Sequence, residues 1–372
     1  MRKLGIFLFM LSVAAGVHAQ EKTSLMSKLA QKNILNHMDV GVNVGTLGVG
    51  IDVAVPVGDY FRVRAGYNYM PSFTIHSDFS VETSNGGSIQ KFFDKKDKID
   101  EYLTQYNIDI NAPEFAKYKG YLDKINNGDV ELKDYVSMGM KPHLHQFKFL
   151  VDVMPFKKDK RWSFTVGFFA GPGNVANAFN LEKESSLLEA VTGYNDFYTD
   201  YFSSGRNLAG HGEVDKITSL LIENGIAGFR LGQFNDGDIA IMVPGEGGTA
   251  RAEMRVNKVR PYIGFGFNSS LSRNKKWNLN VDAGVLILGK PRVYVDNVYK
   301  INTSLIDPDN ECYDIIRPNA EWTAFVIDEP LQHVDLIHDL YGIDGKVGKM
   351  ARLASKFKAY PNISVTLTYR LY

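Results

Sequence analysis

Eight segments of the chain alternate between apolar side chains and small, polar or charged ones. Such a period of two is typical of strands whose two faces meet different environments. Each segment offers roughly nine to eleven residues, the length that a tilted strand needs to cross a bilayer. The segments lie near 38–46, 48–57, 60–75, 143–155, 162–171, 251–268, 277–289 and 361–372.

The polar face of these segments carries charges, and these charges help to distinguish a soluble β-sandwich from a membrane barrel. In the third segment Phe61 and Val63 alternate with Arg62 and Arg64. A soluble sandwich would turn the arginines to bulk water, whereas a narrow barrel encloses them in a lumen filled by side chains. Buried charges must be paired, so we expect a polar network inside the barrel; an ion path is the alternative. The expected members are Arg62, Arg64, Lys148, Asp152, Arg260, Asp282 and Arg370.

The connections between segments alternate in length. Those after the second, fourth and sixth segments hold only a few residues, whereas 76–142, 172–250 and 291–359 are long insertions. Outer-membrane barrels have short periplasmic turns, long outside loops and an even number of strands. The pattern therefore predicts an all-β transmembrane antiparallel barrel of about eight strands with partly helical extracellular insertions.

The insertions contain apolar residues at helical spacing. Because they carry so much apolar surface, we expect them to pack into a cap over the barrel mouth. The expected helices lie near 89–103, 115–125, 187–198, 214–221, 331–341 and 347–357.

The first 19 residues resemble a secretory signal peptide, with Arg2 and Lys3 before an apolar run and a small-residue cleavage site ending at Ala19. A membrane anchor helix is the alternative, but the apolar run is shorter than the roughly 20 residues that a spanning helix needs. We expect export to the cell outer membrane and one mature barrel domain over 20–372. Cys312 is the only cysteine, so an intramolecular disulfide is excluded.

Two details concern the ends of the strands. Tyr60, Trp162 and Trp277 each follow a turn and begin a strand, as expected for an aromatic girdle at a lipid boundary; core positions are the alternative. Pro261 cannot donate to a ladder, and the apolar parity slips beside it. These two facts predict a β-bulge near 257–261, with 249–260 extending above the membrane.

The strand motifs resemble the outer-membrane β-barrel proteins of Bacteroidetes, a largely uncharacterised group of small OmpA/OmpX-like or OmpW-like barrels. The resemblance rests on Val40–Val57, Lys258–Gly266, Asp282–Val285 with Gly289–Val293, and Tyr360–Tyr372, under half of the chain. It implies a monomeric barrel, surrounded by outer-membrane lipid and assembled by the outer-membrane insertion machinery. It implies no reaction.

Candidate chemical sites are weak. Lys+Arg 42 balances Asp+Glu 42, which gives no sign of nucleic acid as a partner. His143 with His145, and His333 with Asp335, His338 and Asp339 on an expected helix, lack convincing metal spacing. The run Asp307–Glu311 lacks the glycine and spaced glutamate of an EF-hand. We expect no cofactor and no metal.

Three functions remain open. The leading one is a surface-exposed structural or binding protein whose helical cap contacts an unknown extracellular ligand or protein. The first rival is a narrow channel or transporter. The second is a lipid-modifying or proteolytic enzyme, for which Ser72, His76 and Ser77 lie together but lack a Gly-x-Ser-x-Gly motif.

Overall fold

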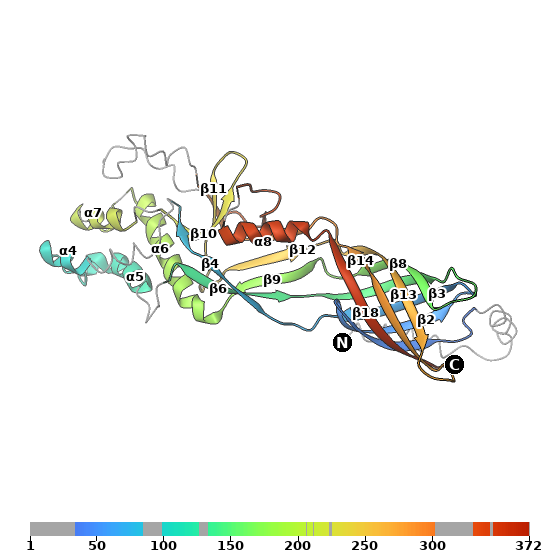
Figure 1. Ribbon diagram of the computed structural model, residues 1–372. Coiled ribbons are helices and arrows are strands. Elements are labelled where there is room, and N and C mark those ends of the chain that lie inside the picture. The colour runs from blue at the N-terminus through green and yellow to red at the C-terminus, as the bar shows by residue number, and fades with distance from the viewer. Residues whose placement is uncertain are drawn as a thin grey trace, which may run out of the picture.

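Eight strands close into an antiparallel barrel at one end of an elongated molecule (Figure 1). The computed structural model describes residues 34–84, 99–125, 133–205, 207–210, 212–222, 225–301, 330–342 and 345–371. The barrel strands, in their order around the wall, are β1 (Asp39–Gly45), β18 (Ala359–Arg370), β14 (Trp277–Ile287), β13 (Val259–Ser270), β8 (Trp162–Ala170), β7 (His145–Val153), β3 (Phe61–Tyr69) and β2 (Gly48–Pro56). The predicted fold class, an eight-stranded antiparallel barrel with partly helical insertions, is confirmed.

The two faces of the barrel wall differ as the alternation predicts. Outward side chains such as Phe147, Phe265 and Ile363 are 61%, 66% and 57% exposed. Inward ones such as Arg64 and Asp152 are at most 2% exposed. Seven of the eight strands have 9 to 12 residues. At about 3.3 Å per residue and a tilt of about 40°, such strands make a wall roughly 23–30 Å tall.

A six-stranded sheet continues the barrel wall on one side. Its order is β17-β15-β12-β9-β6-β4, and five of its strands prolong β14, β13, β8, β7 and β3 in the same order that these have in the barrel. The strands are β4 (Ile75–Ser80), β6 (Tyr135–Pro142), β9 (Asn174–Asn180), β12 (Arg251–Arg255), β15 (Arg292–Val295) and β17 (Val334–Asp335). We call this sheet and everything beyond it the stalk.

Proline and glycine mark the boundary between barrel and stalk, which we call the rim. Pro71, Pro142, Pro172 and Pro291 lie where a barrel strand passes into a stalk strand. Because proline lacks the N–H that a ladder needs, these four positions favour an interruption of the strand. The β1–β2 hairpin does not continue, since Gly48 adopts a φ of +90° in a tight turn at the rim.

The far part of the stalk contains a second sheet and most of the helices (Figure 1). The sheet order is β16-β11-β10-β5, from β16 (Val298–Ile301), β11 (Ile239–Met242), β10 (Ala227–Gln233) and β5 (Glu82–Thr83). The helices are α4 (Ile99–Gln105), α5 (Ala116–Ile125), α6 (Ser185–Ser203), α7 (Gly212–Leu221) and α8 (Gly345–Lys356), with 3₁₀ turns at Pro113–Phe115 and Glu182–Glu184. Helix α8 contacts both β4 and β15 of the stalk sheet.

The largest hydrophobic core of the described chain lies in the stalk. It contains the α6 residues Leu188, Val191 and Phe197, each fully buried, together with residues of α5, α7 and both stalk sheets. The barrel interior contributes only a small second cluster. The stalk therefore folds around its own hydrophobic core, unlike irregular loops that only cover the mouth of a barrel.

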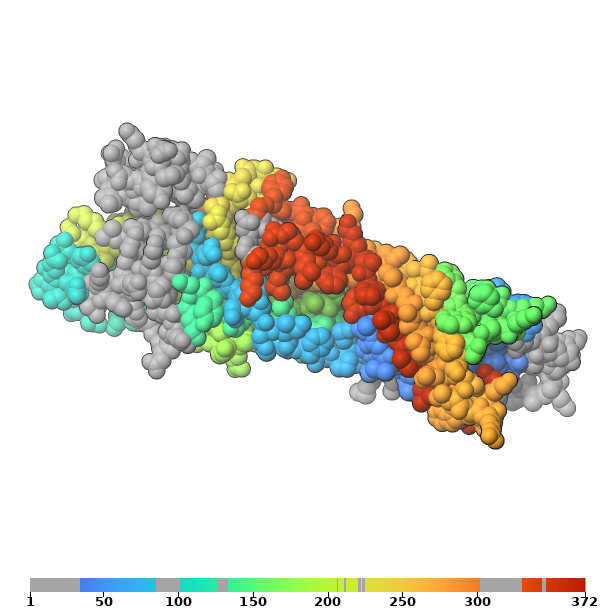
Figure 2. Space-filling view, in the orientation of Figure 1, coloured from blue at the N-terminus to red at the C-terminus, as the bar shows by residue number. Residues whose placement is uncertain are grey.

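Several predictions about the insertions were wrong. The stalk extends the barrel instead of capping it, and strands build its half next to the barrel (Figures 1 and 2). Residues 331–341 form β17 and turns in place of a helix. No bulge occurs at Pro261, because β13 pairs with β8 without a shift from Val259 onward; the register shift lies between Met254 and Arg255 of β12.

Other predictions lie partly or wholly outside the described residues. The signal peptide, Cys312 and the run Asp307–Glu311 fall there, as does most of the helix expected at 89–103. Within the described ranges, none of the helices is both long and apolar enough to cross a membrane.

Candidate functional site: barrel interior, rim and stalk

A network of ion pairs crosses the barrel lumen. The Arg64 guanidinium donates to Asp282 Oδ2 at 2.8 Å and to Asp152 Oδ1 at 2.8 Å, and Arg62 donates to Asp152 Oδ2 at 2.8 Å. Strands β3 and β14 lie on opposite sides of the barrel, with three strands between them either way. The Arg64–Asp282 pair therefore spans the lumen and fills it at mid-height.

A second buried ion pair lies beside the first. Lys148 Nζ is 2.7 Å from Asp52 Oδ1, and both side chains are at most 6% exposed. The pair passes over Gly66, where a Cβ atom would lie 2.2 Å from Asp52 Oδ1 and 2.9 Å from Lys148 Cε. Gly66 is the residue between Asp52 and Lys148 in the strand register, so a side chain there would occupy the space of the ion pair.

Arg260 makes contacts of another kind. It is 0% exposed and donates to Gln146 Oε1 at 2.8 Å, to Asn257 O at 2.8 Å and to Pro172 O. The two carbonyl groups belong to the chain segments that join β12 to β13 and β8 to β9. Arg260 therefore ties the barrel to the stalk, and the described structure shows no carboxylate paired with it.

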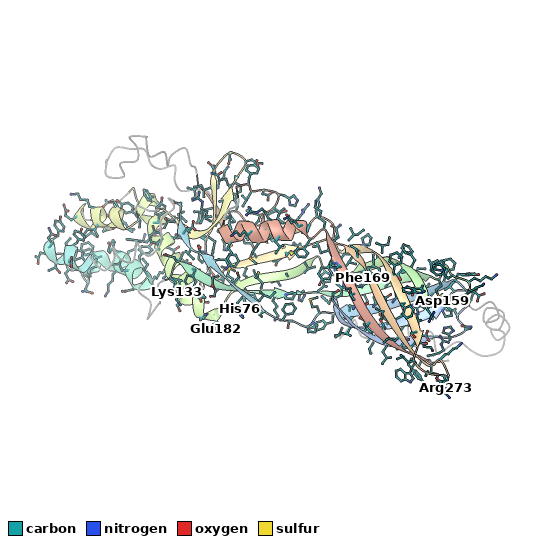
Figure 3. All side chains as sticks on the ribbon, viewed as in Figure 1. His76, Lys133, Asp159, Phe169, Glu182 and Arg273 are labelled. Carbon is teal, nitrogen blue, oxygen red and sulfur yellow. The ribbon has the colours of Figure 1, made fainter. Side chains whose placement is uncertain are left out.

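An apolar plug closes the stalk end of the lumen. Leu47 from the β1–β2 turn, Phe169, Tyr262 and Leu286 are at most 3% exposed and pack together with Leu150, Val256 and Leu288. The Phe169 and Tyr262 rings meet edge to face, with centroids 5.5 Å apart. Figure 3 places Phe169 between the turn end of the barrel, where Asp159 and Arg273 lie, and the stalk. The ion pairs and the apolar plug together fill the barrel interior with side chains.

The predicted network residues thus occupy the lumen in different ways. Arg62, Arg64, Lys148, Asp152 and Asp282 lie in buried ion pairs, whereas Arg370 pairs with Asp39 at 3.0 Å near the turn end, where its side chain is 32% exposed. The sequence prediction omitted Asp39 and Asp52. Asp52 could have been found, because it alternates with Ile51 and Val53 on the same parity as the glycines of β2.

The three predicted girdle residues lie at the turn end of the barrel wall. Trp162 and Trp277 are 50% and 45% exposed. Each packs against a ring on a neighbouring strand at an interplanar angle of 60°, Trp162 against Phe267 and Trp277 against Tyr369, with ring centroids 4.8 and 5.0 Å apart. Lys160 Nζ lies 5.5 Å from the Tyr60 ring. All three rings therefore face outward beside polar turns.

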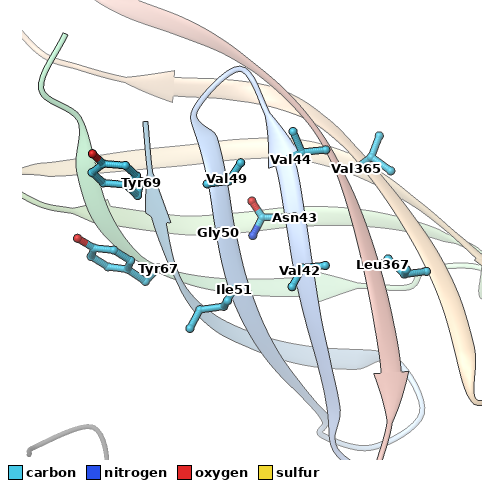
Figure 4. A pocket seen from close by; sticks show the side chains of 10 residues that line it. All are labelled: Val42, Asn43, Val44, Val49, Gly50, Ile51, Tyr67, Tyr69, Val365 and Leu367. Carbon is cyan, nitrogen blue, oxygen red and sulfur yellow. The ribbon is translucent and has the colours of Figure 1, made fainter. Parts of the chain in front are cut away.

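A shallow apolar groove of about 640 Å³ runs over the outer face of β18, β1, β2 and β3. Its floor contains the small side chains of Val42, Val44 and Val49, and the larger Tyr67 and Tyr69 border it (Figure 4). The groove results from this difference in side-chain size and belongs to the apolar outer belt.

Those candidate chemical groups that lie in the described part of the chain do not assemble into a catalytic or metal site. His76 and Ser77 are consecutive residues of β4, so their side chains lie on opposite faces of the sheet. His333 lies 3.1 Å from Asp296, whereas His338 lies 2.7 Å from Asp335, so the two histidines contact different carboxylates. Among the described residues there is no group of three or more His, Cys, Asp or Glu side chains that could hold a metal ion.

Helices α4 to α7 form the end of the stalk farthest from the barrel (Figure 1). Phe197 of α6 packs against Tyr118 and Tyr121 of α5, with ring centroids 5.4 Å apart in both pairs. Burial raises the pKa of Tyr118 to about 12. By contrast, Tyr102 of α4 and Tyr106, which directly follows this helix, are 39% and 44% exposed.

No protein-family model matches the chain, and no curated protein matches its sequence. Among solved structures, it is similar to CarO2 of Acinetobacter baumannii, with 12% identity, a TM-score of 0.36 and coverage of 91% of this chain and 99% of that chain. It is also similar to CarO of the same organism, with 11% identity, a TM-score of 0.34 and coverage of 89% and 96%.

Proposed function

We propose that this protein is an outer-membrane barrel of a Gram-negative bacterium that anchors a rigid stalk outside the cell, where the stalk contacts a ligand, a protein partner or the surrounding matrix. The proposal rests on the structural difference between the barrel and the stalk. The barrel presents an apolar belt outward and fills its own interior, whereas the stalk contains the main core.

The apolar belt supports the membrane location. Soluble proteins rarely expose contiguous apolar patches beyond a few hundred Å², yet outward valine, isoleucine and phenylalanine side chains surround the whole barrel. Aromatic rings lie at its turn end, where a bilayer interface would be. The strand motifs that resemble Bacteroidetes barrels support the same location, and with it a cleaved signal peptide and assembly by the outer-membrane insertion machinery.

The filled lumen argues against the channel alternative. An ion would have to pass the Arg64–Asp282 pair and then the apolar plug, and both fill the cross-section of a barrel that has only eight strands. Such an interior is better suited to stabilising the barrel as an anchor for the stalk than to conducting ions. The enzyme alternative has no supporting observation in the described residues, since His76 and Ser77 diverge.

Two measurements test the proposal. In a Cys312→Ser background, single cysteines placed at exposed stalk positions, for example at Lys117 and Lys183, should react with a membrane-impermeant maleimide on intact cells, whereas one at Lys158 in a barrel turn should react only after lysis. Purified protein in planar bilayers should give no discrete conductance steps. Labelling of Lys158 on intact cells would refute the orientation, and steady conductance would favour the channel.

A further inference from the structure

Four lysines gather on a short arc of the rim, on neighbouring strands of the wall. Lys258 directly precedes β13, Lys290 follows β14, and Lys356 and Lys358 precede β18. The chains stay side by side there, because Leu288 N donates to Lys358 O at 2.8 Å and Asn257 N donates to Leu288 O at 3.0 Å. Neighbouring strands are about 4.8 Å apart, so the backbones of this lysine arc lie within about two strand spacings.

Among the residues that the structure describes, no carboxylate forms a salt bridge with the lysine arc. All four side chains are exposed, and no aspartate or glutamate occurs in 255–260, 286–294 or 345–360. The nearby arginines differ, since Arg255 pairs with Glu253 at 2.7 Å and Arg292 lies 3.9 Å from Asp335. Within the described chain, no salt bridge is formed by any lysine of the arc. Several unneutralised ammonium groups in one place attract polyanions.

The lysine arc lies directly above the apolar belt. The outward residues Val259, Ile287 and Ile363 of the same three strands are 56%, 46% and 57% exposed. Phe357, which lies between Lys356 and Lys358 in the sequence, is 38% exposed. Apolar wall, aromatic residue and cations thus follow one another along the barrel axis, in the order of the acyl chains, interface and headgroups of a bilayer leaflet.

We propose that Lys258, Lys290, Lys356 and Lys358 bind the phosphate groups of an anionic lipid in the leaflet on the stalk side. This inference rests on the proposed membrane location. A headgroup that carries two phosphates fits best, because several ammonium groups on adjacent strands can contact both phosphates at once. Bound lipid would fix the depth of the barrel and the direction in which the stalk projects.

The test uses the full mature protein in a non-ionic detergent, with bound lipid counted by native mass spectrometry. The probes are diphosphoryl lipid A, monophosphoryl lipid A and phosphatidylcholine. The protein should bind diphosphoryl lipid A most tightly, and rising salt should weaken that binding. The variant K258Q/K290Q/K356Q/K358Q should bind it at least about ten-fold more weakly, since each lysine near an anionic surface contributes measurably.

A matched control removes the same charge from parts of the stalk that lie away from the rim. The variant K117Q/K124Q/K183Q/K216Q changes side chains that are 61–73% exposed, and it should bind lipid A within about two-fold of the parent protein. Heat-modifiable gel migration checks that each barrel is folded. Should the four-residue variant fail to fold, K356Q/K358Q alone should still weaken binding.

Three results would overturn the inference: undiminished lipid A binding by the folded arc variant, equally tight binding of phosphatidylcholine, or stabilisation of the protein by inorganic phosphate alone to the same extent as by lipid A. A chain that stays soluble and monomeric without detergent would instead refute the proposed function. Failure of the inference and failure of the function are therefore distinguishable.

Discussion

Removal of the Arg64 guanidinium should strongly destabilise the barrel. Arg64 is 2% exposed and bonds two carboxylates on different strands, Asp152 and Asp282. In Arg64→Met, Asp152 keeps its bonds to Arg62 and Thr165, each at 2.8 Å, but Asp282 loses its only ion pair in the described structure. An uncompensated buried charge costs about 3–5 kcal/mol, so we expect a loss of that size in the free energy of unfolding.

A double-mutant cycle separates the unpaired charge from lost packing. Adding Asp282→Asn to Arg64→Met removes the orphaned charge, so the double variant should be more stable than Arg64→Met alone. The coupling energy between the two positions should exceed about 1.5 kcal/mol. Arg62→Met is the matched control, because Asp152 then retains Arg64, and its cost should be about half as large.

Equilibrium unfolding in lipid vesicles measures these differences. In a Trp322→Phe background, guanidinium titrations can follow the emission of Trp162 and Trp277, which lie at the turn end of the barrel and away from the mutated residues. A cost below about 1 kcal/mol for Arg64→Met, or additive effects of the two substitutions, would refute the argument that the pair is desolvated and mutually dependent.

Three further predictions concern other parts of the fold. Gly66→Ala should lower the free energy of unfolding of the barrel by at least about 1 kcal/mol in the same titration, because the new Cβ atom would lie 2.2 Å from Asp52 Oδ1. Gly58→Ala is the control, because its Cβ atom would meet no atom within 4 Å and only the backbone strain of a φ of +76° would remain. A larger loss for Gly58→Ala than for Gly66→Ala would contradict the steric reason. Phe169→Ala should cost about 3–5 kcal/mol by emptying the plug, and a cost below 1 kcal/mol would mean that the mouth is not packed. The raised pKa of Tyr118, about 12 against an ordinary 10.0, means that its contribution to stability is complete below pH 10 and is lost as the pH rises towards 12. Between pH 9.5 and 12 the free energy of unfolding of the stalk should therefore fall by about 2 kcal/mol more in the parent protein than in the Tyr118→Phe variant, as measured by protease resistance. Equal losses in the two proteins would contradict this prediction.

The sequence predicted one stalk strand, β12, in the segment 249–260 that was expected to extend above the membrane. Most of the other stalk strands escaped sequence analysis for a physical reason. Alternation appears only where the two faces of a strand meet different environments, but all seven residues of β9 are partly buried and all four of β11 are buried. Short strands of this kind resemble irregular structure in a sequence. The prolines at the rim, Pro71, Pro142, Pro172 and Pro291, were a usable signal, because each interrupts a run that would otherwise read as one long strand.

Helices were predictable where one face is buried. The segments expected at 115–125, 187–198 and 214–221 correspond to α5, α6 and α7. The segment at 331–341 has a similar apolar spacing, yet Asp335 accepts hydrogen bonds from the backbone of Val293 and Ile337 and holds the chain against β15 as an extended strand and turns. Tertiary contacts of a side chain with backbone thus overrode local propensity.

Local pattern by itself determined that this chain has two-faced strands, how many there are and where the short turns fall, because those properties depend on residues one or two positions apart. Which charges meet was decided only in three dimensions. Arg64 and Asp282 are 218 positions apart and lie on strands that are not neighbours, so their contact depends on the closure and stagger of the whole wall. The stalk likewise exists because five wall strands keep their neighbours beyond the rim, a property of pairing that no single segment encodes.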